Sequence, residues 1–214
     1  MTRPPLVARQ FSHPTGPLGR VAGRMMALGN GGLNAWVVAT TAARLDPAAV
    51  GRVAELGPGP GLGLARLLDA FPHAQVWGVD RSEAMLRQAR RRNAAAHRAG
   101  RLTLLRGDTT AILELAPVDL IVAVHVLYFL ADPATQLGRL HAALAPGGVL
   151  ALGYQLRPHM PAISQQQFPR GGHRLYESDD EVRDVLRDAG WSTVDISVDG
   201  PREAPHGRLA LATR

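Results

Sequence analysis

The residues best placed to do chemistry are an acid and three glycines at alternate positions: Glu55, Gly57, Gly59 and Gly61. They follow a short apolar run typical of a buried strand and precede a helical pattern over residues 62–71. Glycine tolerates positive φ and lets a ligand touch the backbone, and the following helix begins with free N–H groups. Such a loop at the end of a first parallel strand predicts a nucleotide-sized ligand. Pro58 and Pro60 remove two N–H donors that a pyrophosphate would need.

Three later polar residues also stand where predicted strands end. Asp80 closes the second strand, where a carboxylate can accept hydrogen bonds from both hydroxyls of a ribose. The alternative for Asp80 is an aspartate that only caps a turn or a helix. Asp108 closes the third strand. His125 follows the fourth strand, and an imidazole of ordinary pKa there could be a general base or a hydrogen-bonded structural residue.

An alternation of strands and helices positions these residues. Strands are predicted at residues 52–56, 75–79, 102–105, 118–124, 149–152, 191–198 and 208–212. Helices are predicted at residues 62–71, 82–98, 109–115, 133–144 and 178–189. This order predicts an α/β fold, with a doubly wound and mostly parallel sheet. Residues 153–177 are polar and rich in proline and glycine, and they interrupt the alternation without a predicted element.

The N-terminal part forms a separate pattern. Apolar residues over 16–45, broken by Gly29-Asn30-Gly31-Gly32, predict two helices and a turn. We expect a helical cover segment (1–46) on a ligand-binding domain (47–214), in one compact unit. The cover is expected to close over the cleft and to form an acceptor pocket with residues 153–177; the alternative is an extension of the core on the far side of the sheet. Candidate contacts with the acceptor are His13, Trp36, Tyr154, His159 and His173.

Composition narrows the class of protein. The formal net charge is +6, and all 24 basic residues are arginine. The densest arginine cluster, at 87–98, carries no interleaved aromatic residues, so a solvated helix face is favoured over a nucleic-acid site. The chain has no cysteine, hence no disulfide or thiolate nucleophile. Without an apolar run of membrane-spanning length or a secretory leader, a cytoplasmic enzyme is expected.

The pattern Glu55-x-Gly57-x-Gly59-x-Gly61 resembles motif I of the class I S-adenosylmethionine (SAM) dependent methyltransferases. Leu144-Ala145-Pro146-Gly147-Gly148-Val149-Leu150 resembles the family's turn before strand five, and Tyr176 to Trp191 resembles its helix before strand six. The resemblance covers about residues 50–214, and small bacterial members related to quinone-biosynthesis C-methyltransferases look most similar. It implies a seven-stranded Rossmann-like sheet in which the strand at 208–212 runs antiparallel between strands five and six.

The resemblance also implies roles in binding SAM, with S-adenosylhomocysteine as product. Glu55 would lie near the ammonium of the methionine part, and Asp80 near the ribose. Asp108 would reach the adenine amine, with an ordinary N-cap as the equal alternative. The remaining cofactor residues would be Gly57, Pro58, Gly59, Gly61, Arg81, Met85, Thr109, His125 and Val126, with Met85 equally a core residue. His125 and Tyr128 are the candidate catalytic residues, and no metal site is expected.

Missing signatures point to a small-molecule acceptor. The family's amino-methylating motif does not follow strand four, and the absence of cysteine and lysine excludes covalent base methylation and the ribose-methylating tetrad. A nicotinamide-dependent oxidoreductase is an alternative function, although the two loop prolines and the G-x-G-x-G spacing argue against it. A basic nucleic-acid-binding protein is a further, disfavoured alternative. Homodimerisation is compatible with this interpretation.

Overall fold

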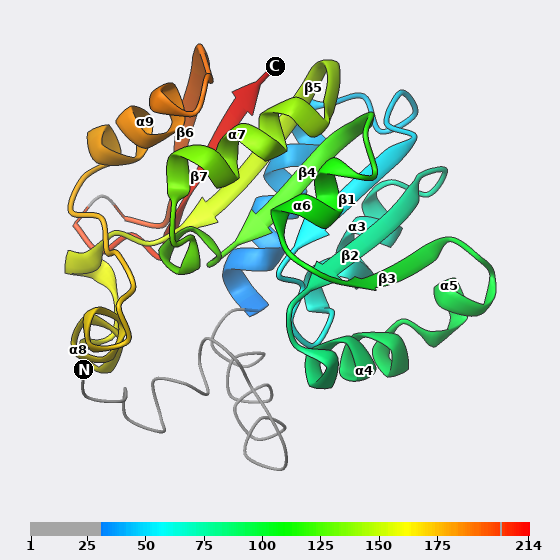
Figure 1. Ribbon diagram of the computed structural model, residues 1–214, viewed down its shortest axis with the longest axis horizontal. Helices are drawn as coiled ribbons and strands as arrows, with labels where there is room; N and C mark the ends of the chain where they lie inside the picture. Colours follow the sequence, from blue (N-terminus) through cyan, green and yellow to red (C-terminus); the bar gives the residue numbers. More distant parts are fainter. Residues whose placement is uncertain (1–30, 202) are drawn as a thin grey trace.

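A seven-stranded sheet organises the described residues, 31–201 and 203–214, in the computed structural model (Figure 1). The strands are β1 (Arg52–Leu56), β2 (Gln75–Asp80), β3 (Leu102–Arg106), β4 (Val118–Val124), β5 (Leu144–Tyr154), β6 (Thr193–Asp199) and β7 (Gly207–Thr213). Their order is β3-β2-β1-β4-β5-β7-β6, and β7 runs antiparallel to both of its neighbours. The predicted seven-stranded, mostly parallel sheet is confirmed, including the place and direction of the strand at 208–212.

Helices cover both faces of this sheet. They are α3 (Leu62–Ala70), α4 (Glu83–Arg92), α5 (Ala94–Arg98), α6 (Thr109–Leu113), α7 (Pro133–Ala143), α8 (Ala162–Arg170) and α9 (Asp179–Asp188), with 3-10 turns η1 (Leu127–Phe129) and η2 (Arg157–His159). Three helices begin at a side-chain cap, because Ser82, Asp132 and Ser178 each accept a hydrogen bond from the first turn of the helix that follows. No helix in the described part of the chain has the length and apolar character needed to cross a membrane.

Two buried apolar clusters hold the layers together. One joins β4 and β5 to α6, α7 and α9, with Leu140, Leu186 and Trp191 fully or almost fully buried. The other joins the opposite face to α3 and to the helix over residues 31–44, through Leu64 and Val37. Because β4 is apolar except for Asp119 and lies between these clusters, both of its faces are buried, as in other parallel sheets. Figure 1 shows α7 and α9 on one side of the sheet and residues 31–44 on the other.

The described part of the N-terminal segment extends the core. Residues 31–44 are helical, so the predicted break is wrong for Gly31 and Gly32. Leu33 and Val37 are buried against β7 and β5, where a Cβ on Gly207 or Gly153 would come within 2.3 or 2.8 Å of them. This packing extends the core on the far side of the sheet, while Asn34 of the same helix lines the cavity described below, so the predicted cover stays a prediction. The first predicted helix and His13 lie outside the described residues.

Two other stretches differ from the prediction. Residues 153–177 were expected to lack an element, yet they contain η2 and α8. The helix predicted over 82–98 is interrupted at Asn93, which ends α4 and precedes α5. In addition, β5 begins at Leu144, whereas the predicted strand begins at residue 149. Residues 144–148, which resemble the turn before strand five, are part of the strand.

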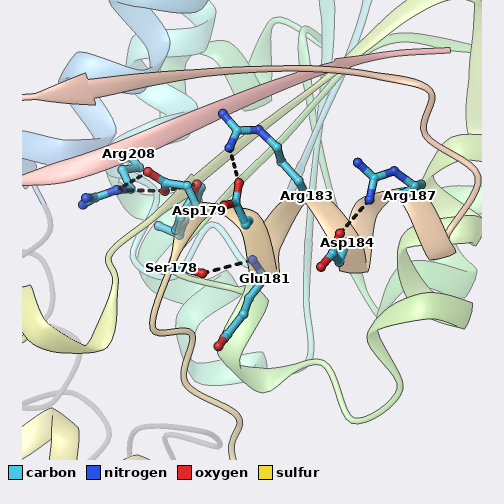
Figure 2. A network of polar contacts seen from close by, with 9 residues as sticks. Ser178, Asp179, Glu181, Arg183, Asp184, Arg187 and Arg208 are labelled. Carbon is cyan, nitrogen blue, oxygen red and sulfur yellow. Dashed lines mark hydrogen bonds and ion pairs between the residues drawn. The ribbon is translucent and has the colours of Figure 1, made fainter.

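A partly buried polar network ties α9 to the sheet. Figure 2 shows Arg208 of β7 facing Asp179, the first residue of α9, and Arg208 Nε donates to Asp179 Oδ2 at 3.0 Å. The Tyr154 hydroxyl donates to Asp179 Oδ1 at 2.8 Å. Tyr154 therefore joins β5 to α9 and does not line the cavity described below, where it had been expected to contact an acceptor.

Candidate functional site

A cavity of about 520 Å³ opens at the carboxyl ends of β1, β2, β3 and β4. Its floor is the loop between β1 and α3, and its far wall is formed by η1 and α8. The predicted residues that line it are Gly57, Pro58, Gly59, Asp80, Arg81, Met85, Asp108, Thr109, His125, Val126 and Tyr128. Glu55 and Gly61 lie outside the lining. One cavity therefore brings together side chains from four strand ends that are far apart in the sequence.

Gly59 presents bare backbone to this cavity. Its φ is +53°, a left-handed conformation that residues with a side chain rarely adopt. A Cβ on Gly59 would meet no atom within 4 Å, so the space above it is open for a ligand. At Gly61, in contrast, a Cβ would collide with Ala89 and Asn93 at 2.7–2.9 Å. Gly59 thus serves ligand approach, whereas Gly61 serves the packing of the loop on α4.

Asn93 and Arg92 hold the glycine loop from the end of α4. Asn93 Nδ2 donates to the carbonyl oxygens of Gly61 and Ala89, both at 3.0 Å, and the Asn93 side chain is buried. Arg92 Nε donates to the Pro60 carbonyl oxygen at 3.0 Å. Sequence reasoning missed this clamp, and the one available signal was an asparagine inside a helical pattern, where it is a weak helix former.

Glu55 is buried beneath the loop. Its exposed fraction is 2%, and its Oε2 atom has no hydrogen-bond partner among the described residues. Burial and the nearby charge of Asp80 raise the pKa of this carboxyl to about 8. Gly63 makes room for it, since a Cβ on Gly63 would come within 2.0 Å of Glu55 Oε1. A buried carboxylate is stable only with a cation or donors beside it, so this group is suited to a cationic ligand atom.

Asp80 links the loop to the cavity wall. Its Oδ2 accepts a hydrogen bond from the Gly59 N–H at 3.0 Å, and its Oδ1 accepts one from the Ser82 N–H at 2.8 Å. Asp80 is thus a turn residue, as one of the two interpretations predicted, and it also lines the cavity. Its predicted contact with ribose hydroxyls stays a prediction.

Asp108 and Thr109 form the wall next to Asp80. Asp108 Oδ1 accepts from the Thr110 N–H at 2.9 Å, and this cap lowers the pKa of Asp108. Asp108 is thus an N-cap in the structure. This hydrogen bond is made by one of the two carboxyl oxygens, so the cap does not exclude ligand binding. Thr109 is buried, and its hydroxyl has no partner among the described residues. Arg81 is exposed at the rim, whereas Met85 is buried and still reaches the cavity.

His125 adopts a strained backbone at the end of β4. Its φ is +57°, which is uncommon outside glycine, and its N–H donates to the Gly153 carbonyl oxygen at 2.9 Å. Desolvation by burial lowers the pKa of the imidazole to about 4. The expectation of an ordinary pKa therefore does not hold, because a lone histidine in a sequence gives no sign of how far it is desolvated. His125 is neutral near pH 7 and is a weak base.

The hydroxyl of Tyr128 is fully engaged with the backbone of Gln155. It donates to the Gln155 carbonyl oxygen at 3.0 Å and accepts from the Gln155 N–H at 2.5 Å. Burial raises the pKa of Tyr128 above its ordinary value. This geometry makes Tyr128 an anchor between η1 and the end of β5, and it does not favour the predicted catalytic role.

The far wall of the cavity is apolar and comes largely from residues 153–177, the segment predicted to help form an acceptor pocket, although its apolar residues were not singled out. Phe129 comes from η1, Ile163 and Phe168 come from α8, and Met160 lies just before α8. His173 lines the cavity, as predicted for an acceptor contact, whereas Trp36 and His159 do not. Within the residues that the structure describes, no three His, Asp or Glu side chains gather as metal ligands would.

The fold and the site together define a class of protein. A dinucleotide-binding Rossmann sheet has the order 3-2-1-4-5-6. Here an antiparallel β7 lies between β5 and β6, next to a glycine loop after β1 and acids that end β2 and follow β3. This combination is the class I methyltransferase fold implied by the sequence resemblance.

Comparisons with known proteins agree with that class. Residues 54–150 match the family model described as a methyltransferase domain. The trans-aconitate 2-methyltransferase of Variovorax paradoxus (strain S110) is 44% identical over 150 residues, 70% of this chain and 50% of that protein. The trans-aconitate 2-methyltransferase of Azoarcus sp. (strain BH72) is 44% identical over 108 residues, 50% of this chain and 40% of that protein. The structure of an O-methyltransferase family protein from Burkholderia thailandensis superimposes with a TM-score of 0.74 at 18% identity, over 92% of this chain and 59% of that chain.

Residues 54–150 therefore match a methyltransferase domain, and the chain has the fold of the class I SAM-dependent methyltransferases. It spans two fifths to a half of the length of the two curated relatives just named. Those relatives carry the name of a trans-aconitate methyltransferase, so the narrower resemblance to quinone-biosynthesis C-methyltransferases stays a prediction. One solved neighbour, a Haemonchus contortus N-methyltransferase with a TM-score of 0.59, is described as a complex with S-adenosylhomocysteine.

Proposed function

We propose that this chain binds SAM in the cavity and transfers its methyl group to a small-molecule acceptor, with S-adenosylhomocysteine as the second product. The observation that carries the proposal is the open, left-handed backbone at Gly59, which Asp80 holds at the cavity floor. The buried carboxyl of Glu55 supports it, because its Oε2 atom has no partner among the described residues and the ammonium of SAM would stabilise its ionised form. We further propose a cytoplasmic location, and a homodimer stays a prediction.

Each group would hold one part of SAM. Asp80 would accept hydrogen bonds from the ribose hydroxyls, while Asp108 and Thr109 would lie beside the adenine. Met85 would pack against the adenine and Arg81 would close the rim. His125 and Val126 would lie beside the methionine part, across the loop from Glu55. These assignments are what the family resemblance implies, and the positions of all these residues except Glu55 in the cavity lining support them.

Catalysis in such a site rests on positioning. When bound, SAM supplies a methyl carbon that accepts the acceptor's lone pair as the carbon–sulfur bond breaks, with the bonding electrons left on sulfur. The residues of this chain would align the two reactants and keep water away, through the apolar wall of η1 and α8. Because His125 has a pKa of about 4, it would be a poor general base at neutral pH, so the acceptor would need to be nucleophilic by itself.

Isotope transfer tests the proposed function. We would incubate the protein with SAM labelled in its methyl group and a metabolite extract, and identify labelled products by mass spectrometry. We expect the amount of labelled methyl group lost from SAM to equal the amount of label that a small molecule gains. A protein that binds SAM but labels no small molecule under these conditions would contradict the proposed acceptor class.

Asp80→Ala should weaken SAM binding. Removing the carboxylate deprives the ribose hydroxyls of a charged acceptor and frees the Gly59 N–H, and we expect a loss of roughly 1–3 kcal/mol in binding free energy. The measurement is isothermal titration with SAM, alongside circular dichroism to show that the sheet is intact. Asp69→Ala, at the exposed end of α3 and away from the cavity lining, is the control. An Asp80→Ala variant with unchanged SAM affinity would show that Asp80 acts only in the turn.

A further inference from the structure

An aromatic cluster forms the acceptor side of the cavity. The Phe129 and Phe168 rings lie 5.3 Å apart, and the His173 ring meets Phe129 edge-on at 4.7 Å. Tyr128 lies 5.8 Å from Phe168 and links the cluster to the buried core. These distances are within the range of favourable aromatic pairs. The cluster therefore joins η1 to α8 and presents ring surfaces to the cavity.

Aliphatic side chains continue this surface. Met160 and Leu130 are buried where they reach the cavity, and Ile163 lines it while 57% of its side chain area stays exposed. An exposed isoleucine on a helix that faces a cavity is an apolar surface still available for contact. Gln136 and Ser164 also line this side, so a bound molecule would find hydrogen-bonding groups as well.

The charged groups of the cavity lie on the other side. Within residues 31–201 and 203–214, the charged lining residues are Asp80, Arg81 and Asp108, at the ends of β2 and β3. Arg81 interacts electrostatically with Asp108, which places its charge near the proposed adenine position. The described aromatic side offers no arginine, and the sequence contains no lysine. Among the described residues, a polyanion bound there would lose its hydration and find only the His173 imidazole as a group able to carry positive charge.

Resting on the proposed methyltransferase function, we propose that the acceptor is a planar, uncharged and largely apolar molecule held against Phe129 and Phe168. It would place its ring over the aromatic cluster, with one or two polar substituents toward Gln136 and Ser164. This class differs from the tricarboxylate in the names of the relatives from Variovorax and Azoarcus. Specificity would arise from ring stacking and from the desolvation cost that an anionic competitor would incur.

Calorimetric titration of the full chain tests this assignment. The probes are 2-naphthol, a planar uncharged phenol, and trans-aconitate, each titrated with and without saturating S-adenosylhomocysteine. We expect 2-naphthol to bind and trans-aconitate to give no binding at the same concentration. Phe168→Ala should weaken 2-naphthol binding about tenfold, because a stacking partner and its apolar area are lost. Phe168→Leu, which keeps the apolar volume, should fall between Phe168→Ala and the unmodified protein.

Two controls separate this proposal from the proposed function. Gln166→Ala changes an exposed residue of the same helix outside the cavity and should leave 2-naphthol binding unchanged. S-adenosylhomocysteine affinity should stay within about twofold in every α8 variant, since these variants change no residue assigned to SAM. Two results would overturn the proposed acceptor class. One is a protein that binds trans-aconitate but not 2-naphthol, and the other is an affinity for 2-naphthol that Phe168→Ala leaves unchanged. Failure to bind S-adenosylhomocysteine would count against the proposed function. In that case the titration of 2-naphthol without S-adenosylhomocysteine would still test the proposed acceptor class.

Discussion

Gly59→Val should abolish SAM binding while the protein stays folded. The valine side chain would occupy the open space above the loop, where no described atom lies within 4 Å and where the ligand is expected. A β-branched residue at φ +53° also carries roughly 1–3 kcal/mol of backbone strain, and relief of that strain would move the Gly59 N–H away from Asp80. We expect a loss of affinity of more than about 100-fold.

The matched control for Gly59→Val is Gly147→Val. Gly147 also has a left-handed φ, of +77°, and a Cβ there would meet no atom within 4 Å, but the residue lies at the start of β5, outside the cavity lining. It should suffer a similar strain and keep SAM affinity. Both variants would be titrated with SAM and melted by circular dichroism. Normal SAM binding by a folded Gly59→Val variant would mean that the ligand lies elsewhere.

Glu55→Gln should change how stability depends on pH. The pKa of Glu55 is raised from 4.5 to about 8 in the folded chain, so between these values the unfolded chain loses the proton and the folded chain keeps it. Stability of the unmodified protein therefore falls as pH rises through this window, by about 1.4 kcal/mol per pH unit from this group. Glutamine cannot ionise, so the variant lacks this component.

The measurement is urea unfolding of both proteins, without ligand, from pH 5 to 8. The free energy of unfolding of Glu55→Gln minus that of the unmodified protein should increase steadily with pH. The difference should be smallest at pH 5, because this is the tested pH closest to the unfolded value of 4.5, where ionisation of the unfolded chain has lowered the stability of the unmodified protein least. A difference that stays constant or shrinks with pH would show that the Glu55 carboxyl is ionised in the folded protein.

Sequence patterns were sufficient for the central sheet. The apolar run over Val118–Val124 predicted a strand buried on both faces, and the N-caps Ser82 and Ser178 marked helix starts that the structure confirms. The helix α8 was missed because proline and glycine flank it, although glutamine itself favours helices. Its formation depends on tertiary contacts, since Phe168 packs on the core through Tyr128 and Phe129.

For the candidate site, the sequence indicated the residues at strand ends and missed those that act through packing. Asp80 and Asp108 could be found because acids that end consecutive parallel strands meet at one edge of the sheet. The sequence did not indicate three further residues, because their roles depend on contacts between segments distant in the sequence. Asn93 holds the glycine loop, Gly63 leaves room for Glu55, and Phe129 contacts the His173 ring. The low pKa of His125 likewise follows from burial, which no local pattern reports.

Titration of the ligand-free protein with SAM, and separately with NAD, tests the central claim most directly. The glycine loop and Asp80 would suit either ligand in outline, but Pro58 and Pro60 leave the loop without N–H donors at those positions for a pyrophosphate. We expect saturable one-site binding of SAM that is lost in Gly59→Val, and no binding of NAD at the same concentrations. Tight binding of NAD without binding of SAM would contradict the assignment of this cavity to a methyl donor.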